Sequence, residues 1–225
     1  MLLVRAGKQV SATGWRSLHM QRFIERFGAL FGAFSMLVGM IGWLVIGDEP
    51  PSIADTSAAE VVAHQVDSSD SLFFGGWLLL VLGVVTLFFG VWLSAAMRDR
   101  GATLLASGAA LGAVMIAVGQ AIDGTMNIIL GDAAETLPEA TVVTLSGITE
   151  YLAWPYVMGG IMIMVCVGAS AKQTGLIPSW LVWIGYAAAV VILIPAEVAF
   201  IGFLVMLLWM VVGGIAMFRK AGAAA

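Results

Sequence analysis

Residues 72–122 read LFFGGWLLLVLGVVTLFFGVWLSAAMRDRGATLLASGAALGAVMIAVGQAI, which is two long apolar runs separated by a short charged turn. The only charges in this stretch are Arg98, Asp99 and Arg100. A helix needs about 20 apolar residues to cross about 30 Å of hydrocarbon. A strand of a membrane barrel would instead alternate polar and apolar residues over about ten positions. Both runs therefore predict membrane-spanning helices, and the fold class is all-α.

Four further apolar runs extend this pattern to both sides of the central pair. The six predicted spans are 27–47, 72–97, 102–122, 151–171, 180–195 and 198–218. The fifth is short, and Pro195 separates it from the sixth, which predicts a tight helical hairpin. We expect one polytopic membrane bundle over 27–220, preceded by a basic segment at 1–26 and followed by a short tail at 221–225.

The composition excludes most other classes of protein. Of the 225 residues, 61% are hydrophobic and only 11% are charged, and the mean hydropathy is +1.02. A soluble domain carries about 25% charged residues, so this chain cannot cover a water-facing surface. Ten basic residues spread over the whole length form no basic face, so we expect the bilayer and no nucleic acid as a partner.

The charges are strongly segregated between the two ends of the predicted spans. All ten basic residues precede the first span or follow the second, fourth and sixth. Only Glu25 and Asp99 share that side, which gives it a charge of +8 and leaves twelve acids opposite. The positive-inside rule then predicts that both termini are cytoplasmic. A cleavable signal peptide is the alternative for 27–47, but this run exceeds the usual length of a signal core.

Two outer loops separate the spans and predict short helices. Ser57 and Glu60 have the spacing of a capping box, which predicts a helix over 58–67. Thr136 and Glu139 predict a second capping box. We expect that second helix to continue into the fourth span with a kink at Pro155.

Acidic residues at the outer ends of the spans form the candidate binding site. Gln120, Asp123 and Asn127 recur on one face of the third span as it leaves the bilayer. If the helices converge, an acidic outer vestibule could attract cations, amines or a basic partner. Its predicted residues are Asp123, Asn127, Glu150, Trp154 and Glu197. The alternative is that the acids and aromatic residues are there because the interface solvates them.

Catalytic and metal-binding chemistry finds no support in the sequence. No ionisable residue lies at the predicted depth of the membrane centre, where pumps and ion-coupled transporters keep one. His19 and His64, the two histidines, lie on opposite sides of the predicted membrane, which excludes a bis-histidine haem site. We therefore predict no catalytic residue, no cofactor and no metal.

Small residues on the first and third spans suggest close helix contacts. Gly28, Gly32, Gly39 and Gly42 lie on one stripe, and 108–112 forms a GxxxG motif. One stripe could bind another protein. Our leading hypothesis is therefore a non-enzymatic accessory subunit of a membrane complex, or a homo-oligomer. The alternative is a carrier or binding protein for a small hydrophobic or cationic molecule.

The segment 175–185 reads GLIPSWLVWIG. It resembles the loop that leads into the fifth span in a family of small six-span bacterial membrane proteins of unknown function, where Gly-Leu-Leu-Pro precedes Trp-Leu and Trp-Ile-Gly. The layout of spans and loops is similar over most of the chain. The resemblance implies a bacterial inner membrane and brings no catalytic residues.

Overall fold

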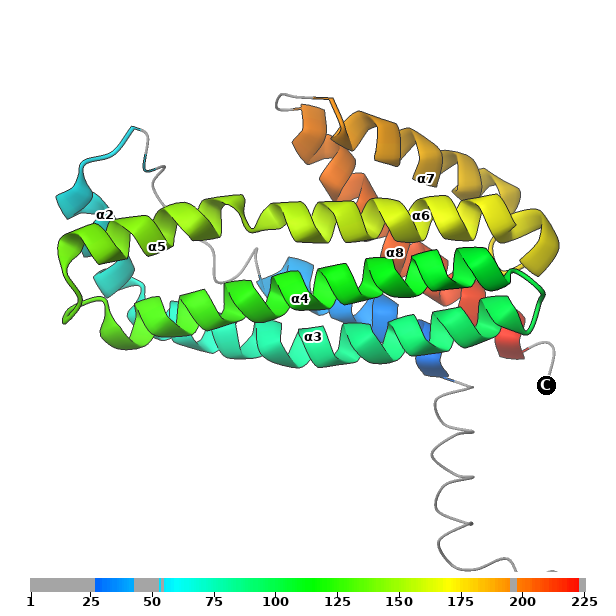
Figure 1. Ribbon diagram of the computed structural model, residues 1–225, viewed down its shortest axis with the longest axis horizontal. Helices are drawn as coiled ribbons and strands as arrows, with labels where there is room; N and C mark the ends of the chain where they lie inside the picture. Colours follow the sequence, from blue (N-terminus) through cyan, green and yellow to red (C-terminus); the bar gives the residue numbers. More distant parts are fainter. Residues whose placement is uncertain (1–26, 43–52, 54, 195–197, 223–225) are drawn as a thin grey trace, which may run out of the picture.

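The computed structural model describes residues 27–42, 53, 55–194 and 198–222, and every regular element in them is a helix. Figure 1 shows the long helices running side by side, with α8 crossing behind the others at an angle. The helices are Phe27–Gly42 (the first helix), α2 Ala58–Asp67, α3 Ser69–Arg98, α4 Thr103–Ala133, α5 Glu139–Tyr151, α6 Ala153–Thr174, α7 Ser179–Ile192 and α8 Val198–Gly222.

Four described stretches are long and apolar enough to cross a membrane. They are Ser69–Arg98, Thr103–Ala133, the α5–α6 stretch Glu139–Thr174, and Phe200–Lys220. Large apolar side chains stand exposed on their outward faces, as at Phe74 (65%) and Leu104 (84%). Lipid tails solvate such apolar faces without a free-energy penalty, whereas their exposure to water would be unfavourable. The prediction of an all-α fold is confirmed for the described residues, and these four helices are consistent with a helical membrane bundle.

The first helix and α7 account for the remaining two predicted spans. They are apolar helices of shorter described length, at Phe27–Gly42 and Ser179–Ile192. The end of the first predicted span and the predicted break at Pro195 lie outside the described residues. The number of six spans therefore stays a prediction.

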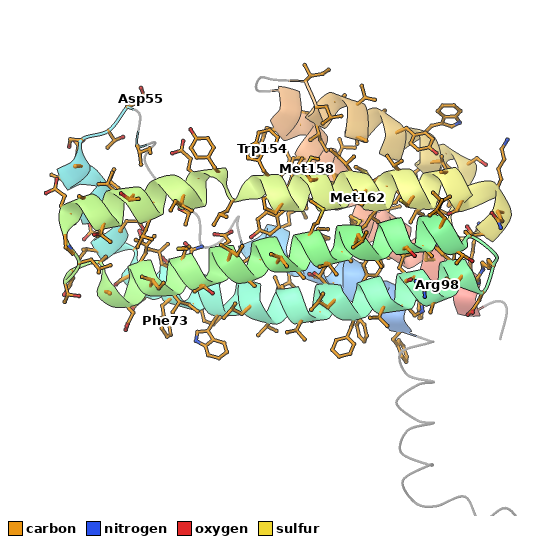
Figure 2. All side chains as sticks on the ribbon, in the orientation of Figure 1. Asp55, Phe73, Arg98, Trp154, Met158 and Met162 are labelled. Carbon is orange, nitrogen blue, oxygen red and sulfur yellow. The ribbon has the colours of Figure 1, made fainter. Side chains whose placement is uncertain are left out.

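The two ends of the bundle carry opposite charge. Arg98 lies at one end and Asp55 at the other (Figure 2). The end with Arg98 gathers the α3–α4 turn, the α6–α7 turn and the end of α8, where Lys220 Nζ donates to Gly175 O at 2.6 Å. We call it the basic end. The opposite end, with α2 and α5, is the acidic end. Because hairpin turns bring distant charges together, the segregation along the sequence becomes a polarity of the molecule.

Glycine allows α4 to approach both of its neighbours closely. A Cβ added at Gly76 of α3 would lie 2.5 Å from Gly124 O of α4, and one at Gly112 of α4 would lie 2.6 Å from Gly159 O of α6. Backbone-to-backbone contact of this kind is the main source of helix association in lipid, where burial of apolar surface supplies little. Helices α3, α4 and α6 consequently form a closely packed layer of the bundle.

Apolar side chains fill the bundle toward its basic end. Trp209 is 2% exposed, and its indole Nε1 donates to Leu181 O at 2.7 Å, which joins α8 to α7. Leu93, Met97 and Met164 are fully buried in the same cluster. This packing closes the basic end of the bundle.

The fourth predicted span is interrupted close to the predicted kink. α5 ends at Tyr151, Leu152 is the junction, and α6 begins at Ala153 (Figure 1). Pro155 cannot donate to the carbonyl of Tyr151, and its ring crowds that carbonyl. The helix therefore breaks at Leu152, three residues before the proline itself.

Of the two predicted capping boxes, one forms. Ser57 Oγ accepts from Glu60 N at 3.4 Å, and the Glu60 carboxylate accepts in return from Ser57 N. The prediction of a second box is wrong, because Pro138 is the N-cap of α5 and makes no side-chain cap. Thr136 Oγ1 instead donates to Ala133 O, at the end of α4.

The glycine contacts predict different effects on stability for two matched substitutions. Gly112→Ala places a methyl group against the α6 backbone and should lower stability by about 1–3 kcal/mol. Gly213→Ala is the control, because its Cβ would make only ordinary van der Waals contacts, with Leu181 Cδ2 at 3.7 Å and with the Trp209 ring at 3.8 Å. Thermal unfolding in a mild detergent measures both. Equal melting temperatures for the two variants would contradict the packing described.

The capping box of α2 predicts a pH effect. Hydrogen bonds from the side chain and backbone of Ser57 hold the pKa of Glu60 below its usual value. This stabilisation is present above the ordinary glutamate pKa and is lost as the pH falls through the lowered one. Ser57→Ala should raise the pKa of Glu60, which NMR titration of labelled glutamate carboxyls measures. An unchanged titration would show that Ser57 does not cap the helix.

Candidate functional site

A cavity of about 650 Å³ lies inside the bundle toward the acidic end. The first helix, α4, α6 and α8 supply most of its wall, and α5 supplies part of the rim. Most of the wall is apolar, with Met36, Phe203, Met206 and Met210 among the lining residues. Cavities of about 300–1,000 Å³ with a few placed polar groups are typical of small-molecule sites.

A chain of buried hydrogen bonds ends at the cavity. The hydroxyls of Ser35 and Thr86 are 2.8 Å apart, and Thr86 Oγ1 donates to Gln120 Oε1 at 3.0 Å. All three residues are buried, with exposures of 1%, 0% and 4%. The hydroxyl of Ser35 lies within hydrogen-bond distance of both Thr86 Oγ1 and the carbonyl of Leu82, the latter at 3.3 Å. The chain thereby joins the first helix, α3 and α4, and it fixes the amide of Gln120.

Asp123 lies one helical turn beyond Gln120 and also lines the cavity. Its Oδ2 accepts from the hydroxyl of Tyr156 at 2.8 Å, and its Oδ1 accepts from Asn127 Nδ2 at 2.8 Å. The bond from Tyr156 ties α6 to α4 just beyond the break at Leu152. In the described part of the chain, no basic side chain forms an ion pair with Asp123.

The structure brings together three of the five predicted site residues. Asp123, Glu150 and Trp154 line the same cavity. Asn127 stands behind Asp123 as its hydrogen-bond donor and does not line the cavity. Glu197 lies outside the described residues. Figure 2 shows Trp154 on α6, near the break between α5 and α6.

Sequence reasoning missed the residues that complete the polar end of the cavity. Tyr156 follows Trp154 by two positions, and nothing in its local sequence marks it as a partner of Asp123. Ser35, Thr86 and Gln120 contact one another over separations of 34 to 51 positions along the chain, which local patterns do not reveal. Gln120 was placed on the correct face of its helix. The direction of its hydrogen bonding was not predictable, because it depends on Thr86.

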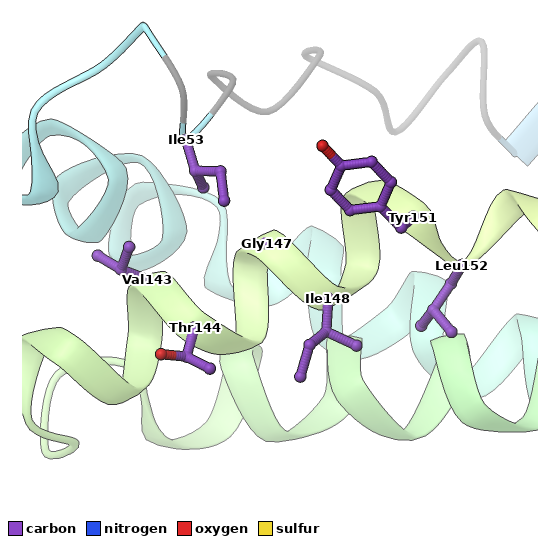
Figure 3. A pocket seen from close by; sticks show the side chains of 7 residues that line it. All are labelled: Ile53, Val143, Thr144, Gly147, Ile148, Tyr151 and Leu152. Carbon is purple, nitrogen blue, oxygen red and sulfur yellow. The ribbon is translucent and has the colours of Figure 1, made fainter.

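A second hollow of about 570 Å³ lies over α5 and is open to the surroundings. Ile53 stands above Gly147 at one side, and Tyr151 bounds the other (Figure 3). The lining is mostly apolar, and the hydroxyl of Thr144 is already used as a donor to Ala140 O. This hollow offers no arrangement of groups that could carry chemistry.

Among the described residues, no group of three or more His, Cys, Asp or Glu side chains could hold a metal ion. Carboxylate, amide, phenol and indole groups in an apolar cavity are suited to binding and orienting a molecule. Comparison with family models, curated proteins and solved structures found no match to this chain.

The buried chain predicts a stability effect at Thr86. Thr86→Val leaves the carbonyl of Gln120 without its donor and should destabilise the protein by about 1–3 kcal/mol. The double variant Thr86→Val/Gln120→Leu should recover part of this loss, because the orphaned carbonyl is removed. Thr125→Val is the control, since the exposed Thr125 hydroxyl donates only to Ala121 O in its own helix.

Unfolding in mixed micelles, followed by tryptophan fluorescence, measures all three variants. If Thr86→Val were as stable as Thr125→Val, the hydrogen bond from Thr86 to Gln120 would make no measurable contribution to stability.

Proposed function

We propose that this chain is a six-span protein of a bacterial plasma membrane that binds a small hydrophobic or cationic molecule in its internal cavity. The observation that carries the proposal is the cavity itself. It combines an apolar wall with an amide and a carboxylate, those of Gln120 and Asp123, at one end. Polar groups that line a cavity bind either ordered water or a ligand, whereas a cavity that stays empty is apolar.

The orientation follows from the polarity of the bundle. The basic end faces the cytoplasm under the positive-inside rule, and both termini lie there. Asp123 is about 30 Å along α4 from its first residue, at 1.5 Å per residue. This is close to the full thickness of the hydrocarbon. The polar end of the cavity then lies near the outer surface of the membrane, and the apolar part lies within it.

The glycine contacts favour a binding protein over an accessory subunit. Cβ atoms added at Gly28 and Gly32 would collide with Trp92 and Phe89 of α3, and Gly112 faces α6. The small-residue stripes that suggested a protein partner are therefore used in packing within the chain. The glycines at these positions therefore give the accessory-subunit hypothesis no separate support.

The family resemblance of the segment 175–185 is part of the same proposal. In the structure this segment forms the α6–α7 turn and the start of α7. Gly175 has a φ of +62°, and Pro178 is the N-cap of α7. These two residues have local structural roles, which agrees with a family signature that carries no catalytic residue.

Native mass spectrometry of the protein, gently extracted from its own membrane, tests the proposal. The wild type should retain a molecule of small mass. Gly39→Leu should lose it, because Gly39 lines the cavity and its Cβ has only one neighbour, Leu82 Cδ1 at 3.7 Å. Ala121→Leu is the matched control, since Ala121 is exposed on α4 and does not line the cavity.

Equal retention by Gly39→Leu and the wild type would contradict binding in this cavity. A stoichiometric protein partner in place of a small molecule would instead support the accessory-subunit hypothesis.

A further inference from the structure

We infer that the molecule bound in the cavity carries an amine next to a hydrogen-bond acceptor, followed by an apolar tail. This inference rests on the proposed function and names the class of ligand. Its basis is the pairing of Gln120 and Asp123, which present a donor and an acceptor to one cavity from successive turns of α4.

The donor is the amide nitrogen of Gln120. Its carbonyl oxygen is occupied by Thr86, so the nitrogen is the part of the amide that remains for a ligand. Among the residues that the structure describes, this nitrogen donates to no group, although the side chain is 4% exposed. The nitrogen is accessible from the cavity, since the one buried side-chain N or O atom without a partner among the described residues is Gln65 Oε1. A carbonyl or hydroxyl oxygen of a ligand in the cavity is therefore suited to accept from it.

The acceptor is the carboxylate of Asp123. A carboxylate has about four acceptor positions, and Tyr156 and Asn127 occupy one on each oxygen. Two positions remain for a ligand. A carboxylate near the hydrocarbon without a basic partner in the described part of the chain is unfavourable, and an ammonium group would neutralise its charge.

The surroundings of the pair agree with this ligand. Tyr156 contacts Asp123, and Trp154 lines the same cavity; the faces of aromatic rings attract cations. The apolar remainder of the cavity, with Phe203, Met206 and Met210, suits a hydrocarbon tail. Side chains at i and i+3 of a helix are about 5–6 Å apart at Cβ, so the amine and the acceptor of the ligand must be close together.

Three synthetic probes test the inference on the protein in nanodiscs. Glycine decylamide has the amine, the adjacent carbonyl and the tail; N-acetylglycine decylamide lacks the charge; decylamine lacks the acceptor. Binding is measured by quenching of tryptophan fluorescence, with empty nanodiscs to correct for partitioning into lipid. We expect glycine decylamide to bind wild-type protein about tenfold more tightly than either analogue.

Asp123→Asn should remove the preference for the charged probe, and Gln120→Leu should remove the preference for the probe with a carbonyl. Asp132→Asn is the matched control, because Asp132 is an exposed aspartate of the same helix outside the cavity. It should keep both preferences. The comparison of probes on wild-type protein needs no variant, so a folding defect in one of them leaves the test decisive.

The possible failures are distinguishable. If the acetylated and charged probes bound wild-type protein equally, and Gly39→Leu reduced both, the amine would be excluded while cavity binding stood. If Gly39→Leu left the binding of every probe unchanged, the proposed function and this inference would both be overturned.

Discussion

The close contact of the α4 backbone with α3 on one side and α6 on the other is the constraint on which the rest of the structure depends. In lipid, helices associate through packing and hydrogen bonds, so such contacts decide which faces meet. The glycines of α4 that face α6, at 108, 112 and 119, and those that face α3, at 124 and 131, form two stripes about 100° or more apart around the helix. The strip between them holds Gln120 and Asp123. The same packing that fixes α4 therefore turns its polar face toward the interior of the bundle.

The cavity lies among the first helix, α4, α6 and α8. Met206 of α8 packs against Gly160 of α6. Long side chains such as those of Met36 and Phe203 line the cavity. Toward the basic end, Trp209 and Met97 complete the packing, so the open volume is confined to the acidic end. The break at Leu152 lies at the level of this volume. It separates α6, whose 22 residues match the thickness of the hydrocarbon, from α5.

Much of the fold could be predicted because hydropathy and charge act locally. The apolar runs, the basic end and the capping box of Ser57 and Glu60 each depend on neighbours in sequence. The box expected at Thr136 failed for a local reason as well, since Pro138 took the N-cap position. The site was predictable only in part. The face shared by Gln120, Asp123 and Asn127 follows from helical spacing, but the contacts of Ser35 with Thr86 and of Tyr156 with Asp123 join distant segments, and no periodicity reveals them.

At the polar end of the cavity, the Gln120 carbonyl and the Asp123 carboxylate have hydrogen-bond donors, whereas the Gln120 nitrogen has no acceptor among the described residues. This difference is the main argument for a ligand. Thr86 donates to the carbonyl of Gln120, and Ser35 is within hydrogen-bond distance of Thr86 and of Leu82 O. Tyr156 and Asn127 donate to Asp123. The Gln120 nitrogen donates to no described residue and is accessible from the cavity, although Asp123 lies just one turn away. The two side chains are instead held apart by separate partners, within the described residues, and both line the cavity. Side chains that are fixed in position before binding lose little conformational entropy when a ligand binds, and this preorganisation raises the affinity.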